Sequence, residues 1–380
     1  MYVTTEGDSA MDSYTDQLPQ GRVVSIDALR GFDMFWIIGG GGLFAGLIEW
    51  LDNPVFRVLG NQLHHSRWNG FTFEDLIFPL FLFIVGLSMP FSLTKRIDRG
   101  DSRKDLYIHI VKRTVTLLVL GLIFNGILNF NFERMRYAGV LQRISICYFF
   151  TALIVMNTRI KGQTIWAGAI LFVYWAAMKL IPVPDFGAGV LTAEGNLAGY
   201  IDRLFLPGRF CCYRFGDNEG LLSTIPAVAT TLLGVLSGHW LRSSTDMRRK
   251  VLGLTAAGIA SLVVGLLWHL LFPINKLIWS SSYVLFAGGW SMLLIALFYW
   301  IIDVRGYRKW AFPFVVVGLN PITIYVAQDI IDFGDFTGFF VNGFIEHMGD
   351  FRPVFWSACV LAVKWLFLYF LYRQKIFLKA

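Results

Sequence analysis

One stretch of the sequence decides the fold class: residues 71–93 read FTFEDLIFPLFLFIVGLSMPFSL. Its only charged residues are Glu74 and Asp75, and the apolar residues form a continuous run instead of recurring at the spacing of an amphipathic helix or strand. A helix needs about 20 mainly apolar residues to cross a bilayer. The stretch therefore predicts a transmembrane helix.

The composition of the whole chain points the same way. Of the 380 residues, 56% are hydrophobic and only 16% are charged, whereas about a quarter of the residues of a soluble protein are charged. This excludes an ordinary soluble enzyme and a disordered chain. We expect an all-α polytopic membrane protein with about ten transmembrane helices. The expected spans are residues 30–50, 71–93, 107–130, 138–157, 164–182, 220–241, 251–271, 278–302, 310–331 and 355–373.

The segments outside these spans complete the expected organisation. Residues 1–22 are polar and lack the basic and apolar regions of a signal peptide, so we expect a cytoplasmic tail followed by one transmembrane domain, residues 23–380. Residues 183–219 form the largest outward loop. Residues 332–353 alternate Phe with Gly, Asp and Asn, which favours a re-entrant or interfacial segment over an eleventh span.

Positive charge in the loops predicts the orientation. One set of alternating loops, with the C-terminus, holds seventeen Lys and Arg, and the opposite set holds nine. Basic residues accumulate on the cytoplasmic side, so both termini are expected to be cytoplasmic. The net charge of +7 then reflects membrane orientation, and nucleic-acid binding is not expected.

The four cysteines give no support for a metal site. Cys147 and Cys359 lie in apolar runs, whereas Cys211 and Cys212 are adjacent in a polar loop. No C-x-x-C pattern is present, and a disulfide between neighbouring cysteines would be strained. We expect unpaired thiols and no metal.

Ionisable residues inside the spans are the main candidates for function, because each is costly at membrane depth unless it is paired, faces a cavity or takes part in chemistry. The inner layer holds Asp27, Arg30, Asp33, Lys112, Arg113 and His239. Arg30 lies three residues from both aspartates, on one helix face, which is also consistent with a purely structural ion pair. Lys112 and Arg113 either extend to the headgroups or bind phosphate.

The outer layer holds Asp75, Asn125, Arg143, Glu219, Gln328 and Asp329, with His64 and His65 in the adjoining loop. An Asp75–Arg143 ion pair would explain two of them structurally. The number of polar groups at one level exceeds what an ion pair needs, and we expect a water-filled pocket open to the outside.

Two interruptions in the apolar runs mark spans that we expect to line a ligand groove or a cavity. Gly39 to Gly42 form a run of four glycines, either for close helix packing or as a groove for a thin ligand chain. The sequence Gly318-Leu-Asn320-Pro321 breaks the ninth span and frees backbone carbonyls that protein or cavity water must satisfy.

The most specific motif is HSRWNGFTFEDLIFPLFLFIVG, residues 65–86. This stretch resembles the heparan-alpha-glucosaminide N-acetyltransferase family of multi-spanning membrane acyltransferases. Matching blocks follow in the same order along the chain: SIDALRGFDM (25–34), AGVLQR (138–143), DNEGLLSTI (217–225), FPINKLIWSSSYV (272–284) and GLNPITIY (318–325).

The resemblance implies transfer of acetyl from cytoplasmic acetyl-CoA to an amino sugar, of the glucosamine or heparan sulfate type, on the far side of the membrane. It implies that His65, with His64 as its neighbour, is the catalytic residue, and it suggests a homodimer. One departure is that Ile37 and Ile38 precede the glycine run where animal members have an asparagine tied to activity. Cytoplasmic termini and the absence of a secretion signal favour a bacterial inner membrane over a lysosomal one.

The chemistry assigns roles to the other candidates. A histidine titrates near neutral pH and suits a general base, with Asp75 orienting His65, Arg143 holding Asp75, and Asn69 or Trp68 stabilising the oxyanion. An acetyl-histidine intermediate is the competing mechanism. The residues expected to hold acetyl-CoA are Arg30, Lys112, Arg113, Gly40 and Gly41, and those expected to hold the acceptor are Trp68, Glu219, Asn125, Asn320 and Gln328.

A transporter of a sugar or other small solute is the rival function, because broken helices and buried charges also suit carriage. No inverted repeat is visible, and carriage does not need a histidine beside a Trp-Asn-Gly turn.

Overall fold

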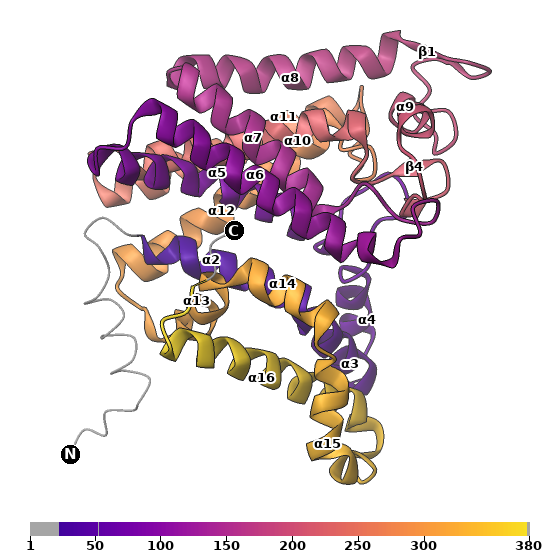
Figure 1. Ribbon diagram of the computed structural model, residues 1–380, viewed down its shortest axis with the longest axis vertical. Coiled ribbons are helices and arrows are strands. Elements are labelled where there is room, and N and C mark those ends of the chain that lie inside the picture. Colours follow the sequence, from indigo (N-terminus) through magenta and orange to yellow (C-terminus); the bar gives the residue numbers. More distant parts are fainter. Residues whose placement is uncertain (1–22, 52, 378–380) are drawn as a thin grey trace.

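A computed structural model describes residues 23–51 and 53–377, and nearly all of their regular structure is helical (Figure 1). Within these residues, eight helices are long and apolar enough to cross a membrane, and a bent pair of helices adds a ninth span. The prediction of an all-α polytopic membrane protein is confirmed. The eight are α2 (Val24–Phe35) continued through η1 (Trp36–Gly40) and α3 (Gly41–Leu51), α5 (Glu74–Asp98), α6 (Arg103–Phe124), α7 (Val140–Asn157), α10 (Leu221–Arg242), α11 (Met247–His269), α12 (Ser281–Tyr299) continued by η3 (Trp300–Val304), and α16 (Arg352–Arg373) preceded by η5 (Gly349–Phe351).

The predicted span at residues 164–182 is also a helix, α8 (Ile160–Leu180). Its 21 residues extend about 32 Å, enough to cross a bilayer. It packs against α10 and turns Ile165, Phe172 and Val173 outward. Such an exposed apolar face is suited to contact with lipid.

The bent pair corresponds to the interruption predicted in the ninth span. η4 (Lys309–Ala311) leads into α13 (Phe312–Leu319), and α14 (Pro321–Ile330) follows after a bend of 63°. Proline cannot donate a helical hydrogen bond, so the helix breaks where the sequence places Pro321. The next helix, α15 (Phe333–Ile345), has 13 residues, too few to span, and lies within the segment predicted to be re-entrant or interfacial.

The short elements gather at one end of the molecule, which we call the His65 end because the loop at residues 62–73 lies there with them. Figure 1 shows α4, α9 and α15 at this end together with the β-hairpins. We call the opposite end, with the loops at residues 99–102, 243–246 and 305–308, the basic end. The short elements are α4 (Pro54–Asn61), η2 (Ile127–Asn129), α9 (Leu197–Phe205) and two antiparallel hairpins, β1 (Pro182–Val183) with β2 (Gly187–Ala188) and β3 (Cys212–Tyr213) with β4 (Gly216–Asp217).

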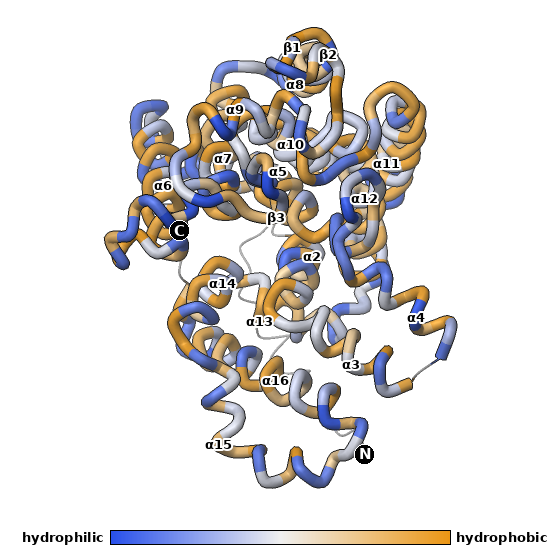
Figure 2. Tube along the Cα trace, turned by 90° about the vertical axis from the view of Figure 1, so that its right-hand side faces the viewer, coloured by the Kyte–Doolittle hydropathy of each residue, from blue (hydrophilic) through white to orange (hydrophobic). Residues whose placement is uncertain are grey.

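Helix α5 runs through the centre and connects the two ends. It packs against α10, α12 and α2, and most of its residues are buried. Its contact with α10 is close because a Cβ on Gly86 would lie 1.9 Å from the Thr231 carbonyl oxygen, and one on Gly234 would lie 2.0 Å from that of Phe83. Figure 2 shows hydrophobic residues along much of the long helices around it. α5 is therefore a fixed support for the loop that precedes it.

Candidate active site

The loop before α5 is folded around the side chain of Asp75. The Asp75 carboxylate is fully buried in the first turn of α5, where the helix dipole favours negative charge. Its Oδ2 accepts hydrogen bonds from the backbone N–H of Ser66 (3.2 Å) and from the backbone N–H and hydroxyl of Thr72 (3.2 and 3.1 Å). Gly70 turns the loop at a φ of 130°, which strongly favours glycine.

His65 is held by the other oxygen of the same carboxylate. Its Nδ1 lies 3.0 Å from Asp75 Oδ1, and 57% of its side chain is exposed, whereas that of Asp75 is not. With Nδ1 on the carboxylate, Nε2 on the far edge of the ring is available to a substrate. A buried carboxylate that orients an exposed imidazole is the arrangement used for general-base and nucleophilic catalysis.

Lys276 completes this cluster and was not predicted as a site residue. Its Nζ lies 3.1 Å from His65 Nδ1, 3.6 Å from Asp75 Oδ1 and 3.5 Å from the carbonyl oxygen of Glu74. Only 9% of the Lys276 side chain is exposed, and burial lowers its pKa while Asp75 opposes that change. The signal was present in the sequence: Lys276 is the only basic residue of its loop and lies in the FPINKLIWSSSYV block.

The expected pairing of Asp75 with Arg143 is wrong: among the described residues the cation beside Asp75 is Lys276. Arg143, on α7, faces the start of α10. It donates to Ser223, to Thr224 Oγ1 at 3.3 Å and to the Gly220 carbonyl at 3.4 Å. Its guanidinium also lies 4.8 Å from the centre of the Trp279 ring. Arg143 therefore fastens α7 to α10 behind the cluster.

The two expected oxyanion donors are fixed by neighbouring loops. Trp68 donates its indole N–H to the Leu191 carbonyl at 2.9 Å, so this N–H is already used. Asn69 accepts from the Asn275 side chain at 3.2 Å through its Oδ1, which leaves its amide NH₂ as the remaining candidate donor. Asn275 precedes Lys276, so the same contact docks the Lys276 loop against the His65 loop.

The other residues expected to bind the acceptor make separate contacts. Glu219 pairs with Arg136, which also holds Asp217 at 2.6 Å. Asn125 donates to two backbone carbonyls of the strand-like segment after α6. Asn320 donates to the Ile376 carbonyl and Gln328 accepts from Lys364. The predicted outer layer is thus divided among several local networks. Of its members that the structure describes, only His65 and Asp75 contact each other, and Lys276 joins them.

A second site lies at the basic end. A cavity of about 780 Å³ opens between α2, α5, the start of α11 and η3. Arg30 lines it, and its guanidinium bonds to Asp27 (3.2 Å) and Ser88 (2.6 Å). The charged residues of the lining are Arg30, Lys95, Arg242, Lys250 and Arg308, and Asp27, Asp98 and Asp303. The excess of basic groups suits an anionic ligand.

Lys112 and Arg113 do not line this cavity, contrary to expectation. They lie on α6, which packs against α7 on another side of the molecule. The Arg113 guanidinium lies 4.5 Å from the centre of the Tyr148 ring, and Lys112 is exposed. The expected ion pair on α2 is only half formed, because Asp27 pairs with Arg30 whereas both carboxyl oxygens of buried Asp33 have no hydrogen-bond partner among the described residues.

The glycine run allows a break in the helix and close packing of α3 against α16. Gly39 has a φ of 144° inside η1, and the Ile38 carbonyl accepts a 2.7 Å hydrogen bond from Lys364 of α16. A Cβ on Gly46 would lie 3.1 Å from the Val354 backbone nitrogen. Gly40 and Gly41 do not line the cavity at the basic end.

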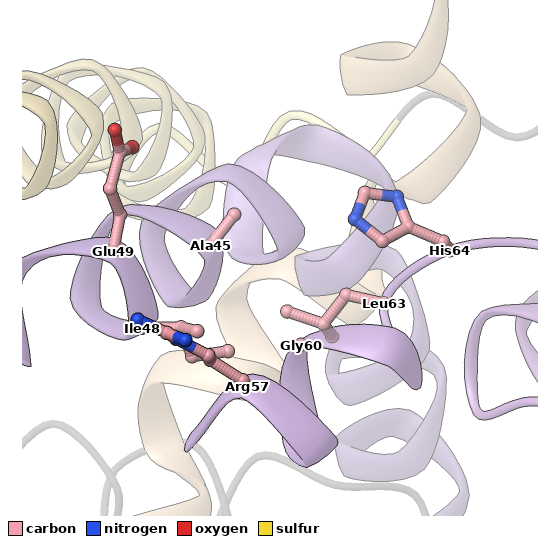
Figure 3. Close-up of a pocket in the computed structure, with 7 residues that line it drawn as sticks. All are labelled: Ala45, Ile48, Glu49, Arg57, Gly60, Leu63 and His64. Atoms are coloured by element: carbon pink, nitrogen blue, oxygen red, sulfur yellow. The ribbon is translucent and has the colours of Figure 1, made fainter. Parts of the chain in front are cut away.

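A smaller pocket lies beside the candidate active site. It has a volume of about 280 Å³ and is formed by α3, α4 and the loop after them. His64 lines it, with Glu49 and Arg57 on the facing helices (Figure 3). The two adjacent histidines therefore differ: His65 belongs to the Asp75 cluster, and His64 faces this pocket.

Two curated proteins are similar to this sequence over most of its length. Residues 22–167 match a family described as a domain of unknown function, DUF5009. The mouse heparan-alpha-glucosaminide N-acetyltransferase is 30% identical over 70% of this chain, and the human protein of that name is 27% identical over 94% of it. This chain is similar in sequence to the heparan-alpha-glucosaminide N-acetyltransferases.

The predicted family relationship is confirmed by these matches. This chain spans 49% of the mouse protein and 60% of the human one, so it is similar to part of each acetyltransferase. The name that the mouse and human proteins share describes the transfer of an acetyl group to the nitrogen of an amino sugar.

Proposed function

We propose that this protein is a membrane acetyltransferase that moves acetyl from acetyl-CoA, bound at the basic end, to an amino sugar at His65. One observation carries the proposal: an oriented His65–Asp75 pair and a cavity rich in basic residues lie at opposite ends of the same helix, α5. The names of the mouse and human relatives support the reaction class.

The cavity at the basic end fits the anionic end of acetyl-CoA. Its five basic side chains exceed its three acidic ones, and Arg and Lys are the usual partners of phosphate. Ser88 lines the cavity and lies thirteen residues from Asp75 on α5, or about 20 Å along the helix axis. The extended pantetheine arm would have to bridge this length to bring the thioester to His65.

The chemistry at His65 follows from the geometry of its ring. In direct transfer, the acceptor amine attacks the thioester carbonyl, Nε2 takes the amine proton, the C–S bond breaks, and the CoA thiolate leaves and is protonated. In the alternative, Nε2 itself attacks the thioester carbonyl, the C–S bond breaks and the CoA thiolate leaves and is protonated; the acceptor amine then attacks the acetyl-histidine, the bond from the acetyl carbon to Nε2 breaks, and the imidazole takes the amine proton. In both, Asp75 orients the ring and stabilises the imidazolium, and Asn69 is the candidate donor to the oxyanion.

The two routes differ in what stays on the protein. With radiolabelled acetyl-CoA and no acceptor, the acetyl-histidine route predicts label on the wild-type chain and none on His65→Ala. Direct transfer predicts no label on either chain.

The loop charges support an orientation in which the basic end faces the cytoplasm and His65 faces outward. The proposed location is a bacterial inner membrane, and the resemblance favours a homodimer. Labelling of the adjacent thiols of Cys211 and Cys212 at the His65 end with an impermeant maleimide in intact cells tests this orientation. Labelling only after the membrane is opened would contradict it.

The function is tested with purified protein in detergent, acetyl-CoA and glucosamine. We expect acetylated product from the wild type and from His64→Gln, and at least a 100-fold lower rate from His65→Ala. The His64 variant is the matched control, because it alters the neighbouring imidazole outside the Asp75 cluster. If the wild type forms no product but proteoliposomes take up sugar without CoA, the protein is a transporter.

A further inference from the structure

The contact between Lys276 and His65 raises the question of how a second cation beside the ring affects its protonation, a question that an oriented His–Asp pair alone does not raise. His65 Nδ1 lies 3.0 Å from Asp75 Oδ1 and 3.1 Å from Lys276 Nζ. Nδ1 carries at most one proton, so it either donates to Asp75 or accepts from Lys276. An imidazolium would place a second cation beside the Lys276 ammonium, with the single negative charge of Asp75 between them.

We infer that Lys276 is a positioning residue whose ammonium balances the charge of Asp75 and opposes the protonation of the His65 imidazole that Asp75 favours. The inference rests on the proposed function only for its consequence in catalysis, because a neutral imidazole is needed both to accept a proton and to attack a thioester. The charge balance itself is a property of the folded chain.

The placement of Lys276 is built into the fold. The N–H of Gly70 donates to the Ile274 carbonyl at 2.9 Å, and Asn275 bonds to Asn69, so the loops bearing His65 and Lys276 are joined on either side of the cluster. The Asn275 side chain also accepts from the backbone N–H of Ile278 at 3.1 Å. Lys276 is buried, so its charge is poorly screened by solvent.

Other charged groups act on the same cluster and must be considered with it. Glu74 adjoins Asp75 on α5, and Glu219 precedes α10; both act on Lys276 through space. His64 adjoins His65 in the chain but lines the small pocket of Figure 3. Among the described residues, Lys276 is the cation in contact with Asp75 and His65, so its removal leaves a net negative environment that favours the imidazolium.

The sign of the effect follows from this balance. Replacing Lys276 by Met removes a positive charge about 3 Å from the ring, which stabilises the protonated form and raises the pH at which the ring becomes neutral. Unit charges at this distance interact strongly even in an effective dielectric near 20. Because His65 is half-exposed, we expect a reduced but measurable upward shift of at least about one pH unit.

The test measures the neutral imidazole directly and does not depend on enzymatic activity. Diethyl pyrocarbonate acylates neutral histidine, and peptide mass spectrometry of the full-length protein in detergent, in a His64→Gln background, reports modification of His65 against pH. We expect the midpoint to rise by at least about one unit in Lys276→Met and to stay within about 0.3 units of wild type in Lys276→Arg. Asp75→Asn should move it in the opposite direction.

An unchanged midpoint in a folded Lys276→Met protein, judged by its gel-filtration profile and thermal unfolding, would overturn the inference. If Lys276→Met does not fold, the charge-retaining Lys276→Arg and the neutral Lys276→Gln make the same comparison, and equal midpoints for these two would overturn it. Because modification is read on the protein, an inactive wild type would refute the proposed function without affecting this result.

Discussion

Replacing Asp75 by Asn is the most informative perturbation of the cluster. The carboxylate is fully buried and accepts from Ser66 and Thr72 through Oδ2, while Oδ1 faces His65 Nδ1 and Lys276 Nζ. An asparagine can keep its oxygen at the Oδ2 position. Its NH₂ group then points at His65 and Lys276, where an acceptor is needed.

The expected loss of stability can be worked from the distances. Asp75 Oδ1 and Lys276 Nζ are 3.6 Å apart, which corresponds to a Coulomb attraction of about 4–5 kcal/mol in an effective dielectric of about 20. Asp75→Asn leaves Lys276 as a buried cation without its counter-charge. Breaking a buried pair in this way costs about 3–5 kcal/mol, so we expect the free energy of unfolding to fall by about that amount.

The expected loss of activity has a different origin. The asparagine NH₂ donates to Nδ1, so the ring proton moves to Nε2 and the ring can no longer accept a proton there. An equivalent change in the serine protease triad lowers kcat by about 10⁴. We expect acetyl transfer to fall by about 10² to 10⁴, with a smaller effect on the apparent affinity for acetyl-CoA, whose proposed cavity lies at the other end of α5.

Reversible unfolding in mixed micelles and steady-state acetylation assays measure the two effects. Glu74→Gln is the matched control, because it removes the adjacent carboxylate, and we expect its cost to be below about 1 kcal/mol. In the double variant Asp75→Asn/Lys276→Met, most of the stability should return because no buried charge is left alone, while activity should not. Purely additive losses of stability would refute the reasoning, since coupled residues give non-additive effects.

Three further predictions concern other parts of the chain. Charge reversal of Arg242 or Lys250 in the cavity should raise the apparent KM for acetyl-CoA by about tenfold or more, whereas Lys112→Glu on the outer face of α6 should not; equal effects in all three would contradict the cavity as the donor site. Arg136→Met leaves Asp217 and Glu219 without their cation and should cost about 3–5 kcal/mol of stability, measured by unfolding in micelles, and a change below 1 kcal/mol would show that the pair contributes little. The neighbouring Cys212 side chain, aided by Arg136 and opposed by burial, lowers the pKa of Cys211 to about 7; its iodoacetamide reaction should therefore reach half its maximal rate near pH 7, and a midpoint near 9 would contradict this.

The sequence was sufficient to predict the fold class and the contact between His65 and Asp75. Apolar runs of about 20 residues are forced to be helices in a bilayer because no other structure satisfies the backbone there, and this made the spans readable. The contact between His65 and Asp75 could be predicted because the two residues lie only ten positions apart, on either side of the start of a helix.

The other contacts of these residues could not be predicted from the sequence, because they depend on which helices pack against each other. Arg143 and Lys276 are both basic and both lie near the outer level, and only the packing of α7 against α10 turns Arg143 away from Asp75. Lys112 was assigned to the donor site by its depth along the span, but depth does not specify the side of the molecule. In the same way, Lys95, Arg242 and Lys250 come together from the ends of three helices, α5, α10 and α11, to line one cavity.

The central claim is that acetyl passes from a donor at the basic end to an acceptor at the His65 end of one chain. The most direct test uses proteoliposomes of uniformly oriented protein, with acetyl-CoA on the side of the basic end and glucosamine on the other. We predict that N-acetylglucosamine accumulates in the glucosamine compartment with wild-type protein and does not with His65→Ala. Product that forms only when both substrates share one side, or that forms equally with His65→Ala, would contradict the account.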